Sequence, residues 1–128
     1  MAQSAQGIDV IFQNAGAAGL GVIQAFSQNG GVGLLGSNSN QNSVAADAML
    51  RSVLIDFPHA FLTVVREVKV RHFCVRIISL GMRNDVVRLI MNSNVRGRIP
   101  LSVLVHVDSV RALMQNGALS ALDTAGGH

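Results

Sequence analysis

The chain has no tryptophan, no tyrosine and only one cysteine, Cys74, among its 128 residues. One cysteine cannot form an intramolecular disulfide, which excludes a disulfide-stabilised scaffold and favours a reducing compartment. Lysine and arginine are absent before Arg51, whereas a secretory signal begins with a positive charge. These absences predict a cytoplasmic protein.

Long apolar runs are also missing. The apolar stretches 8–12, 20–26 and 32–35 are separated by Gln, Asn, Ser and Gly, and none approaches the roughly 18 to 20 residues of a membrane span. We therefore expect no membrane span. With 49% hydrophobic and only 13% charged residues, the chain is nevertheless very apolar for an isolated monomer. This composition predicts a homo-oligomer or a protein complex.

Charge is distributed unevenly along the chain. Residues 10–46 are 37 consecutive uncharged residues, whereas nine of the ten basic residues lie between Arg51 and Arg98. A basic segment of this kind can attract phosphate groups. The alternative is that a highly apolar domain needs these charges for solubility.

Residues 1–43 have the composition of an arm. Seven of the 37 uncharged residues are glycine, and residues 37–43 (SNSNQNS) form a polar, low-complexity linker. Glycine at positions 16, 19 and 21 disfavours a stable helix. The G-x-G-x-x-G spacing at 31–36 lacks the preceding strand and following helix of a dinucleotide site. We predict an arm that is flexible or ordered only on assembly, and no cofactor.

A globular domain is expected over residues 44–123, followed by a frayed tail at 124–128. Ser43 can cap a helix that ends before Pro58. Periodicity leaves residues 63–79 open between helix and strand. Asn84 or Asp85 can cap a helix that includes Val86–Met91.

Two further helices are expected towards the C-terminus. Pro100 is a favoured first helical residue, although the following LSVLVHV also alternates as a strand would. Asp108 or Ser109 can cap a third helix, over 110–115. The fold class predicted from these elements is α+β, as a small α-rich domain preceded by the arm.

Residues 66–122 resemble a winged-helix module, in particular the later half of the La motif of La and La-related RNA-binding proteins. The resemblance rests on Asp85, on 86–91 in place of a family helix, on Gly97-x-x-Pro100-x-x-x-Leu104, and on Val107-x-x-Val110-x-Ala112-Leu113. It implies a winged-helix-like fold and binding to RNA.

The chain departs from the La motif at the base-stacking positions. The family stacks aromatic side chains on bases, whereas the matching positions here hold His72, Val75, Arg76, Val87 and Val107. Only Asp85 matches a residue of the family's ligand pocket. Contact with RNA would therefore depend on Arg and Lys.

Catalytic and metal-binding patterns are not found. His72 and Cys74 are two residues apart, but a structural zinc site needs four ligands in paired spacing. Serine lacks a nucleophile context, and each of the dispersed carboxylates is explained as a cap or an ion-pair partner. We predict no enzymatic activity and no metal site.

The leading hypothesis is a non-enzymatic module that binds RNA, less favourably DNA, through phosphate contacts. Such contacts give salt-dependent binding without sequence information. The alternative is a structural subunit of a homo-oligomer, filament or secretion-type assembly, with the uncharged arm making the subunit contacts. The candidate phosphate-binding residues are Lys69, Arg71, Arg76, Arg83, Arg96 and Arg98.

Overall fold

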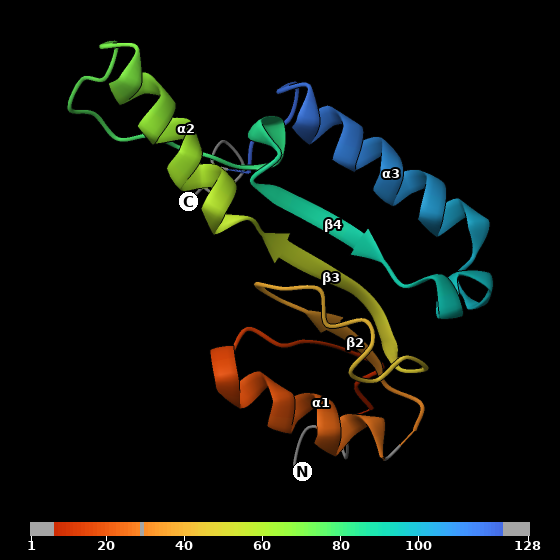
Figure 1. Cartoon of the computed structure of the whole chain (residues 1–128). Helices are drawn as coiled ribbons and strands as arrows, with labels where there is room; N and C mark the ends of the chain where they lie inside the picture. The colour runs from red at the N-terminus through yellow and green to blue at the C-terminus, as the bar shows by residue number, and fades with distance from the viewer. Residues whose placement is uncertain (1–6, 29, 122–128) are drawn as a thin grey trace. The chain divides into compact units, whose positions relative to one another are not determined.

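The computed structural model describes residues 7–28 and 30–121. Within them the chain is mixed α+β, with a four-stranded sheet and three α-helices (Figure 1). It divides into two units. Unit 1 takes the described residues of Met1–Ile55 together with Leu89–Ile99, and unit 2 takes those of Asp56–Arg88 and Pro100–His128.

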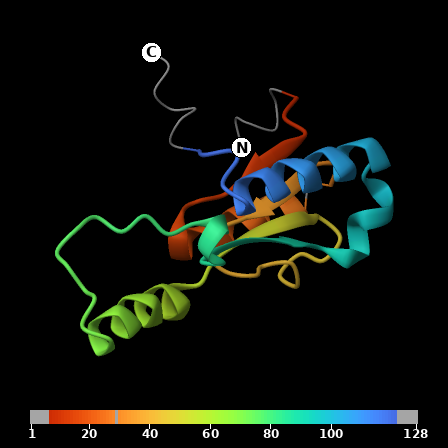
Figure 2. The ribbon, with the colours of Figure 1, turned by 90° about the horizontal axis from the view of Figure 1, so that it is seen from above.

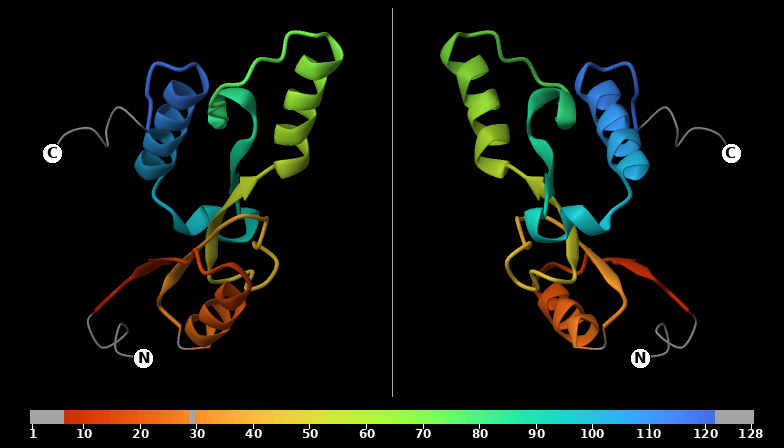
Figure 3. Two further views of the ribbon diagram at one scale, coloured as in Figure 1. Left: turned by 90° about the vertical axis from the view of Figure 1, so that its left-hand side faces the viewer. Right: turned by 90° about the vertical axis from the view of Figure 1, so that its right-hand side faces the viewer.

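Unit 1 begins with a β-α-β arrangement. Strand β1 (Val10–Phe12) is followed by a short 3-10 turn, η2 (Gly16–Ala18), then by helix α1 (Gly19–Ser27) and strand β2 (Gly33–Gly36). The two strands are parallel, with Val10 paired to Gly33. Figure 3 shows α1 alongside β2. A helical crossover is the usual way to join parallel neighbours.

The sheet continues through β3 (Met49–Ile55), which is parallel to β2 with an irregularity in register between Leu34 and Leu35. The fourth strand, β4 (Val87–Met91), lies next to β3. The Asn92 N–H donates to the Leu50 carbonyl at 3.1 Å, and the arrows of β3 and β4 run in opposite directions (Figure 1). The sheet is therefore mixed.

The core of unit 1 lies between α1 and the sheet. Ile23 and Phe26 from α1 pack with Leu34 of β2 and Met49 of β3, and all four are buried. Packing of an apolar helix face is what stabilises a helix this short, because intrinsic propensity alone is insufficient. The glycines therefore do not prevent α1 from forming.

A second anchor of unit 1 is Asn92, at the end of β4. Its amide nitrogen Nδ2 donates to the carbonyl oxygens of Ala46 at 2.7 Å and Met49 at 2.6 Å. Its Oδ1 accepts from the N–H of Asn94 at 3.1 Å, at the start of the 3-10 segment η4 (Ser93–Arg98). One buried side chain thus joins the start of β3 to η4.

Unit 2 contains α2 (Phe57–Lys69), the 3-10 turn η3 (Met82–Asn84) and α3 (Leu101–Gln115), with η3 in contact with α3. Asp56 caps α2 by accepting from the His59 N–H at 3.0 Å, and Pro58 stands in the first turn. A long segment returns from the end of α2 to η3 (Figure 2). No residue of α2 is buried.

The arm expected over residues 1–43 differs most from the structure. Where described, this segment supplies two paired strands and a helix whose side chains form the core of unit 1. Composition suggested an arm because it counts glycine as a helix breaker and takes no account of packing. Residues 1–6 of the expected arm lie outside the described residues.

Several expected elements change type. The helix predicted between the Ser43 cap and Pro58 is instead a run of turns followed by β3, because residues 49–55 pair as a strand of the sheet. The open segment 63–79 is helix as far as Lys69 and then largely irregular. Residues Val87–Met91, expected as a helix both from capping and from the La resemblance, form β4. Residues 87–91 form a strand because they pair with β3.

The C-terminal helix is confirmed from Pro100 onwards, but the two short helices expected there are one, Leu101–Gln115. The α+β class is also confirmed, whereas the winged-helix arrangement is not. The expected domain boundary at 123 and the tail at 124–128 lie outside the described residues.

Candidate functional site

Polar side chains gather at the carboxyl ends of the parallel strands of unit 1. Gln13 directly follows β1, and Ser37 directly follows β2. The polar segment 38–42 comes next, and Ser52 of β3 is paired with Gly36 at the same edge. In open α/β sheets ligands bind outside the carboxyl ends of the strands. We call this set, Gln13, Ser37, Gln41, Asn42 and Ser52, the carboxyl-edge cluster.

Gln13 is held in place by both backbone and side chain. Its N–H donates to the Leu35 carbonyl at 3.0 Å, its Nε2 donates to Gln41 Oε1, and its Oε1 accepts from the Ala15 N–H at 3.2 Å. Only 3% of the residue is exposed. Its amide therefore has a fixed orientation at the end of β1.

Gly19 is required for this arrangement. A Cβ atom at position 19 would lie 1.9 Å from Oε1 of Gln13, so no other residue can start α1 here without displacing the glutamine. The glycine that disfavours a helix by propensity is thus needed for close approach. It places the first turn of α1 directly on the amide of Gln13.

Ser52 organises the other half of the cluster. Its hydroxyl accepts from the Gln41 N–H at 3.0 Å and donates to Oδ1 of Asn42 at 2.7 Å. Gly36 leaves room for this, because a Cβ there would lie 2.6 Å from Gln41 Oε1 and 3.1 Å from Ser52 Oγ. The segment after β2 is therefore folded back onto the sheet.

Ser37 is the exception in this network. The residue is 5% exposed, and its hydroxyl oxygen has no hydrogen-bond partner among the described residues. Burying an unpaired hydroxyl costs about 1–3 kcal/mol. Native structures leave few buried hydroxyls unpaired, so this oxygen calls for a partner such as a water molecule, an ion or a bound molecule.

The chemistry of the cluster is neutral. Its members are amides and hydroxyls, which can donate and accept hydrogen bonds but cannot supply a nucleophile with a base or a general acid at neutral pH. Such an arrangement can orient a polar molecule.

A cavity of about 560 Å³ opens at the opposite edge, next to the starts of β1, β2 and β3. Glycine and apolar side chains form much of its lining, which also includes Asp9, Asp47 and Arg98. The guanidinium of Arg98 already donates to the Asp47 carbonyl at 2.7 Å. We favour the carboxyl-edge cluster because it has convergent hydrogen-bonding groups and one without a partner.

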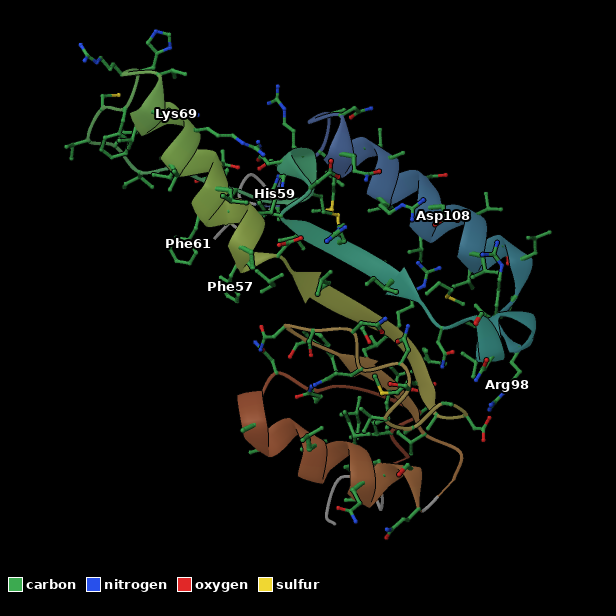
Figure 4. All side chains as sticks on the ribbon, viewed as in Figure 1. Phe57, His59, Phe61, Lys69, Arg98 and Asp108 are labelled. Carbon is green, nitrogen blue, oxygen red and sulfur yellow. The ribbon has the colours of Figure 1, made fainter. Side chains whose placement is uncertain are left out.

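The six predicted phosphate-binding residues are all exposed, but they fall in two units. Arg96 and Arg98 belong to unit 1, where η4 holds them in its last turn (Figure 4 labels Arg98). Lys69, Arg71, Arg76 and Arg83 belong to unit 2. The structure therefore brings them together only within these two groups.

Two of the unit 2 cations, Arg76 and Arg83, contact other residues of unit 2. Arg76 forms an ion pair with Glu67 at 2.8 Å and donates to the sulfur of Cys74 at 3.2 Å. These contacts, with the Cys74 sulfur first, raise the pKa of Arg76 above its ordinary value. Arg83 lies against Gly117, where a Cβ would be 3.3 Å from its Nη1.

Metal ligands do not gather in the part of the chain that the structure describes. There, no three His, Cys, Asp or Glu side chains come together as a metal site would require. No helix among residues 7–28 and 30–121 has the length and apolar character to cross a membrane.

The carboxyl-edge cluster was not predicted from the sequence. The signal that could have found it is a polar residue at the end of each short apolar stretch, Gln13 after Val10–Phe12 and Ser37 after Gly33–Gly36. This signal has meaning only when the stretches are recognised as parallel strands. Because residues 1–43 were interpreted as an arm, the two stretches were not recognised as strands.

Comparison with known proteins gives no family. No protein-family model and no curated protein matches the chain. Two solved structures match 93% of it. One is a transcriptional activator of the comK gene from Bacillus halodurans, with TM-score 0.77 and 16% identity. The other, an ABC transporter system solute-binding protein from Aeropyrum pernix K1, has TM-score 0.72 and 16% identity.

The chain spans 41% of the length of each of these two proteins. At 16% identity the likeness concerns the fold alone. The described chain therefore has the fold of a part of a transcriptional activator and of a part of a solute-binding protein.

Proposed function

We propose that unit 1 binds a small, neutral, polar solute at the carboxyl-edge cluster. The observation that carries this proposal is the buried hydroxyl of Ser37, which lacks a hydrogen-bond partner among the described residues. A solute that donates to this oxygen would remove the cost of leaving it unpaired. Gln13 and Gln41, fixed by their mutual hydrogen bond, would orient the solute.

The absence of charged groups from the cluster indicates the solute class. Neutral amides and hydroxyls match the hydroxyl and carbonyl groups of an uncharged molecule, and they offer no counter-charge to an ion. The matched Aeropyrum pernix protein is described as solute-binding, which supports the class of function. Monosaccharides and polyols are the first solutes to test.

Thermal unfolding with a panel of such solutes tests the proposal. A solute present at about 100 times its Kd should stabilise the native state by about 2.7 kcal/mol. We expect at least one panel member to raise the Tm of the wild type but not that of Ser37→Ala. Without solute, Ser37→Ala should be neutral or more stable by up to about 1 kcal/mol, because it removes an unpaired hydroxyl.

Ser39→Ala is the matched control, since Ser39 lies in the same segment but is exposed. It should keep the solute response. An equal response of Ser37→Ala and wild type, or no response to any panel member, would show that the cluster is not a solute site.

Binding of RNA or another polyanion is a second proposal for this chain. It is supported by Arg96 and Arg98, exposed together in η4, where the guanidinium of Arg98 donates to the backbone carbonyl of Asp47. Both guanidinium groups therefore keep a charge that is available to phosphate.

The Arg96→Glu/Arg98→Glu variant should lose polyanion binding, and binding by the wild type should weaken steeply with salt. Fluorescence anisotropy with labelled single-stranded RNA measures both effects. Arg66→Glu/Arg111→Glu makes the same change of charge at cations outside the predicted set, and equal losses in the two variants would count against the proposed contact.

A further inference from the structure

The cavity of about 560 Å³ at the starts of β1, β2 and β3 is a second candidate site. Small-molecule sites in proteins have volumes of about 300–1,000 Å³, so its size is suitable. The described residues that line it all belong to unit 1, so the cavity is a feature of that unit alone. It shares no lining residue with the carboxyl-edge cluster.

Charged side chains of both signs line this cavity. Asp9 precedes β1, Asp47 precedes β3, and Arg98 is the last residue of η4 (Figure 4 labels Arg98). Three segments that are far apart in the sequence therefore each bring a charge to the same space. Most of the remaining lining is glycine, alanine or a larger apolar side chain such as Val10 and Leu50.

The two aspartates are held by their backbones, which leaves their carboxylates available. The carbonyl oxygen of Asp9 accepts from the Gly33 N–H at 2.7 Å, and that of Asp47 accepts from the Arg98 guanidinium at 2.7 Å. Among the described residues, neither carboxylate forms an ion pair, with Arg98 or with any other cation. The acidic and basic groups of the cavity thus do not neutralise one another.

We propose that this cavity binds a zwitterion with an apolar body, namely a free L-amino acid with an apolar side chain. The carboxylate of such a molecule pairs with the guanidinium of Arg98, whose fork of N–H groups matches a carboxylate. Its ammonium group pairs with Asp9 or Asp47. Its side chain contacts the apolar part of the lining.

The mixture of charges selects a zwitterion over a simple ion. A bound molecule displaces water from the charged groups that it covers, and a desolvated charge without a partner is costly. A ligand with one sign of charge would leave either Arg98 or the aspartates in that state. A ligand with both signs pairs all of them.

This inference goes beyond the two proposals above and can fail without them. The solute site depends on Ser37, which does not line the cavity. Polyanion binding uses Arg98 together with Arg96, and Arg96 does not line the cavity either. Arg96→Gln therefore separates contact with a polyanion from binding of an amino acid.

Nuclear magnetic resonance of the ¹⁵N-labelled chain tests the site directly. The probes are L-leucine, L-isoleucine, L-methionine and L-phenylalanine. We expect at least one of them to shift the amide signals of Gly30, Gly31 and Gly33, which line the cavity, and to leave those of Gln13 and Gln41 unchanged.

Analogues of L-leucine that lack one charge test the pairing. 4-Methylpentanoate has no ammonium group, and L-leucinamide has no carboxylate but is protonated on its α-amino group below about pH 7. Each should bind about tenfold more weakly than L-leucine or worse, because it loses one charge-assisted contact.

Arg98→Gln should weaken the binding of L-leucine by about tenfold or more, whereas Arg96→Gln makes the same change in net charge and should not. If Arg98→Gln fails to fold, Asp9→Asn/Asp47→Asn provides the test. This variant keeps the backbone carbonyls that accept the two hydrogen bonds, and it should show a similar loss. Ser37→Ala should bind L-leucine as the wild type does.

Three results would overturn the proposal. The first is the absence of shifts at the three glycines with every probe at about 10 mM, where a site of millimolar Kd is mostly occupied. The second is an equal loss in Arg98→Gln and Arg96→Gln. The third is binding of 4-methylpentanoate as tight as that of L-leucine, which would indicate a site for a simple anion.

Discussion

Replacing Leu34 by alanine is expected to lower the free energy of unfolding by about 2–5 kcal/mol. Leu34 is completely buried, and it packs against Ile23, Phe26 and Met49 in the core of unit 1. Truncation removes this apolar contact and leaves a cavity that the β-α-β arrangement cannot easily fill. Urea denaturation followed by far-UV circular dichroism measures the change, since the chain has no tryptophan or tyrosine for intrinsic fluorescence.

Leu20→Ala is the matched control for this experiment. Leu20 lies on α1 and is 52% exposed, so the same chemical change should cost less than about 1 kcal/mol. Comparing the two variants distinguishes a segment that packs into the core from a flexible arm. If Leu34→Ala were as mild as Leu20→Ala, residues 1–43 would not contribute to the core.

Asn92→Ala should destabilise the protein by about 2–4 kcal/mol. The substitution removes the donors for the buried carbonyl oxygen of Met49 and the part-buried one of Ala46, and the acceptor for the N–H of Asn94. Buried polar groups left without partners cost more than the net value of the hydrogen bonds themselves. The same urea denaturation measures the effect.

The control for Asn92 is its neighbour Asn94. This residue is exposed, and only its backbone N–H takes part, as the donor to Oδ1 of Asn92. Asn94→Ala keeps that N–H and should change stability by less than about 0.5 kcal/mol. Equal effects at the two positions would show that the amide of Asn92 does not join β3 to η4.

The C-terminal helix and the α+β class could be predicted because local signals decide them. Pro100 is a good helix start, and the apolar residues that follow continue the periodic pattern. The strand β4 could not be predicted in the same way. Asn84 and Asp85 offered a reasonable helix cap, but pairing with β3 is a contact between distant parts of the sequence, and it overrides local propensity.

The carboxyl-edge cluster escaped the sequence analysis for a related reason. Gln13 and Ser37 are separated by a helix and acquire a common location only when β1 and β2 pair in parallel. Glycine was taken as evidence of flexibility, whereas Gly19 and Gly36 allow close approach of Gln13 and Gln41. Composition reports the number of glycines and not what lies against them.

The apolar composition gave a correct indication of exposed apolar surface. Subunit contacts were predicted for the uncharged arm, and large exposed apolar side chains lie on α2 of unit 2 as well. The described part of the arm pairs and packs within unit 1, but it also leaves Val10, Phe12 and Leu20 exposed. Assembly therefore stays a prediction, and exposed apolar side chains occur in both units.

Native-state hydrogen exchange at the amides of Gln13, Gly33 and Leu34 tests the central claim most directly. These N–H groups donate to Leu35 at 3.0 Å, Asp9 at 2.7 Å and Ala48 at 2.9 Å, which joins β1, β2 and the start of β3. If residues 7–28 and 30–43 form an integral layer of unit 1, the three amides exchange only with a large opening of the unit. Exchange at the rate of an unstructured peptide would contradict the account.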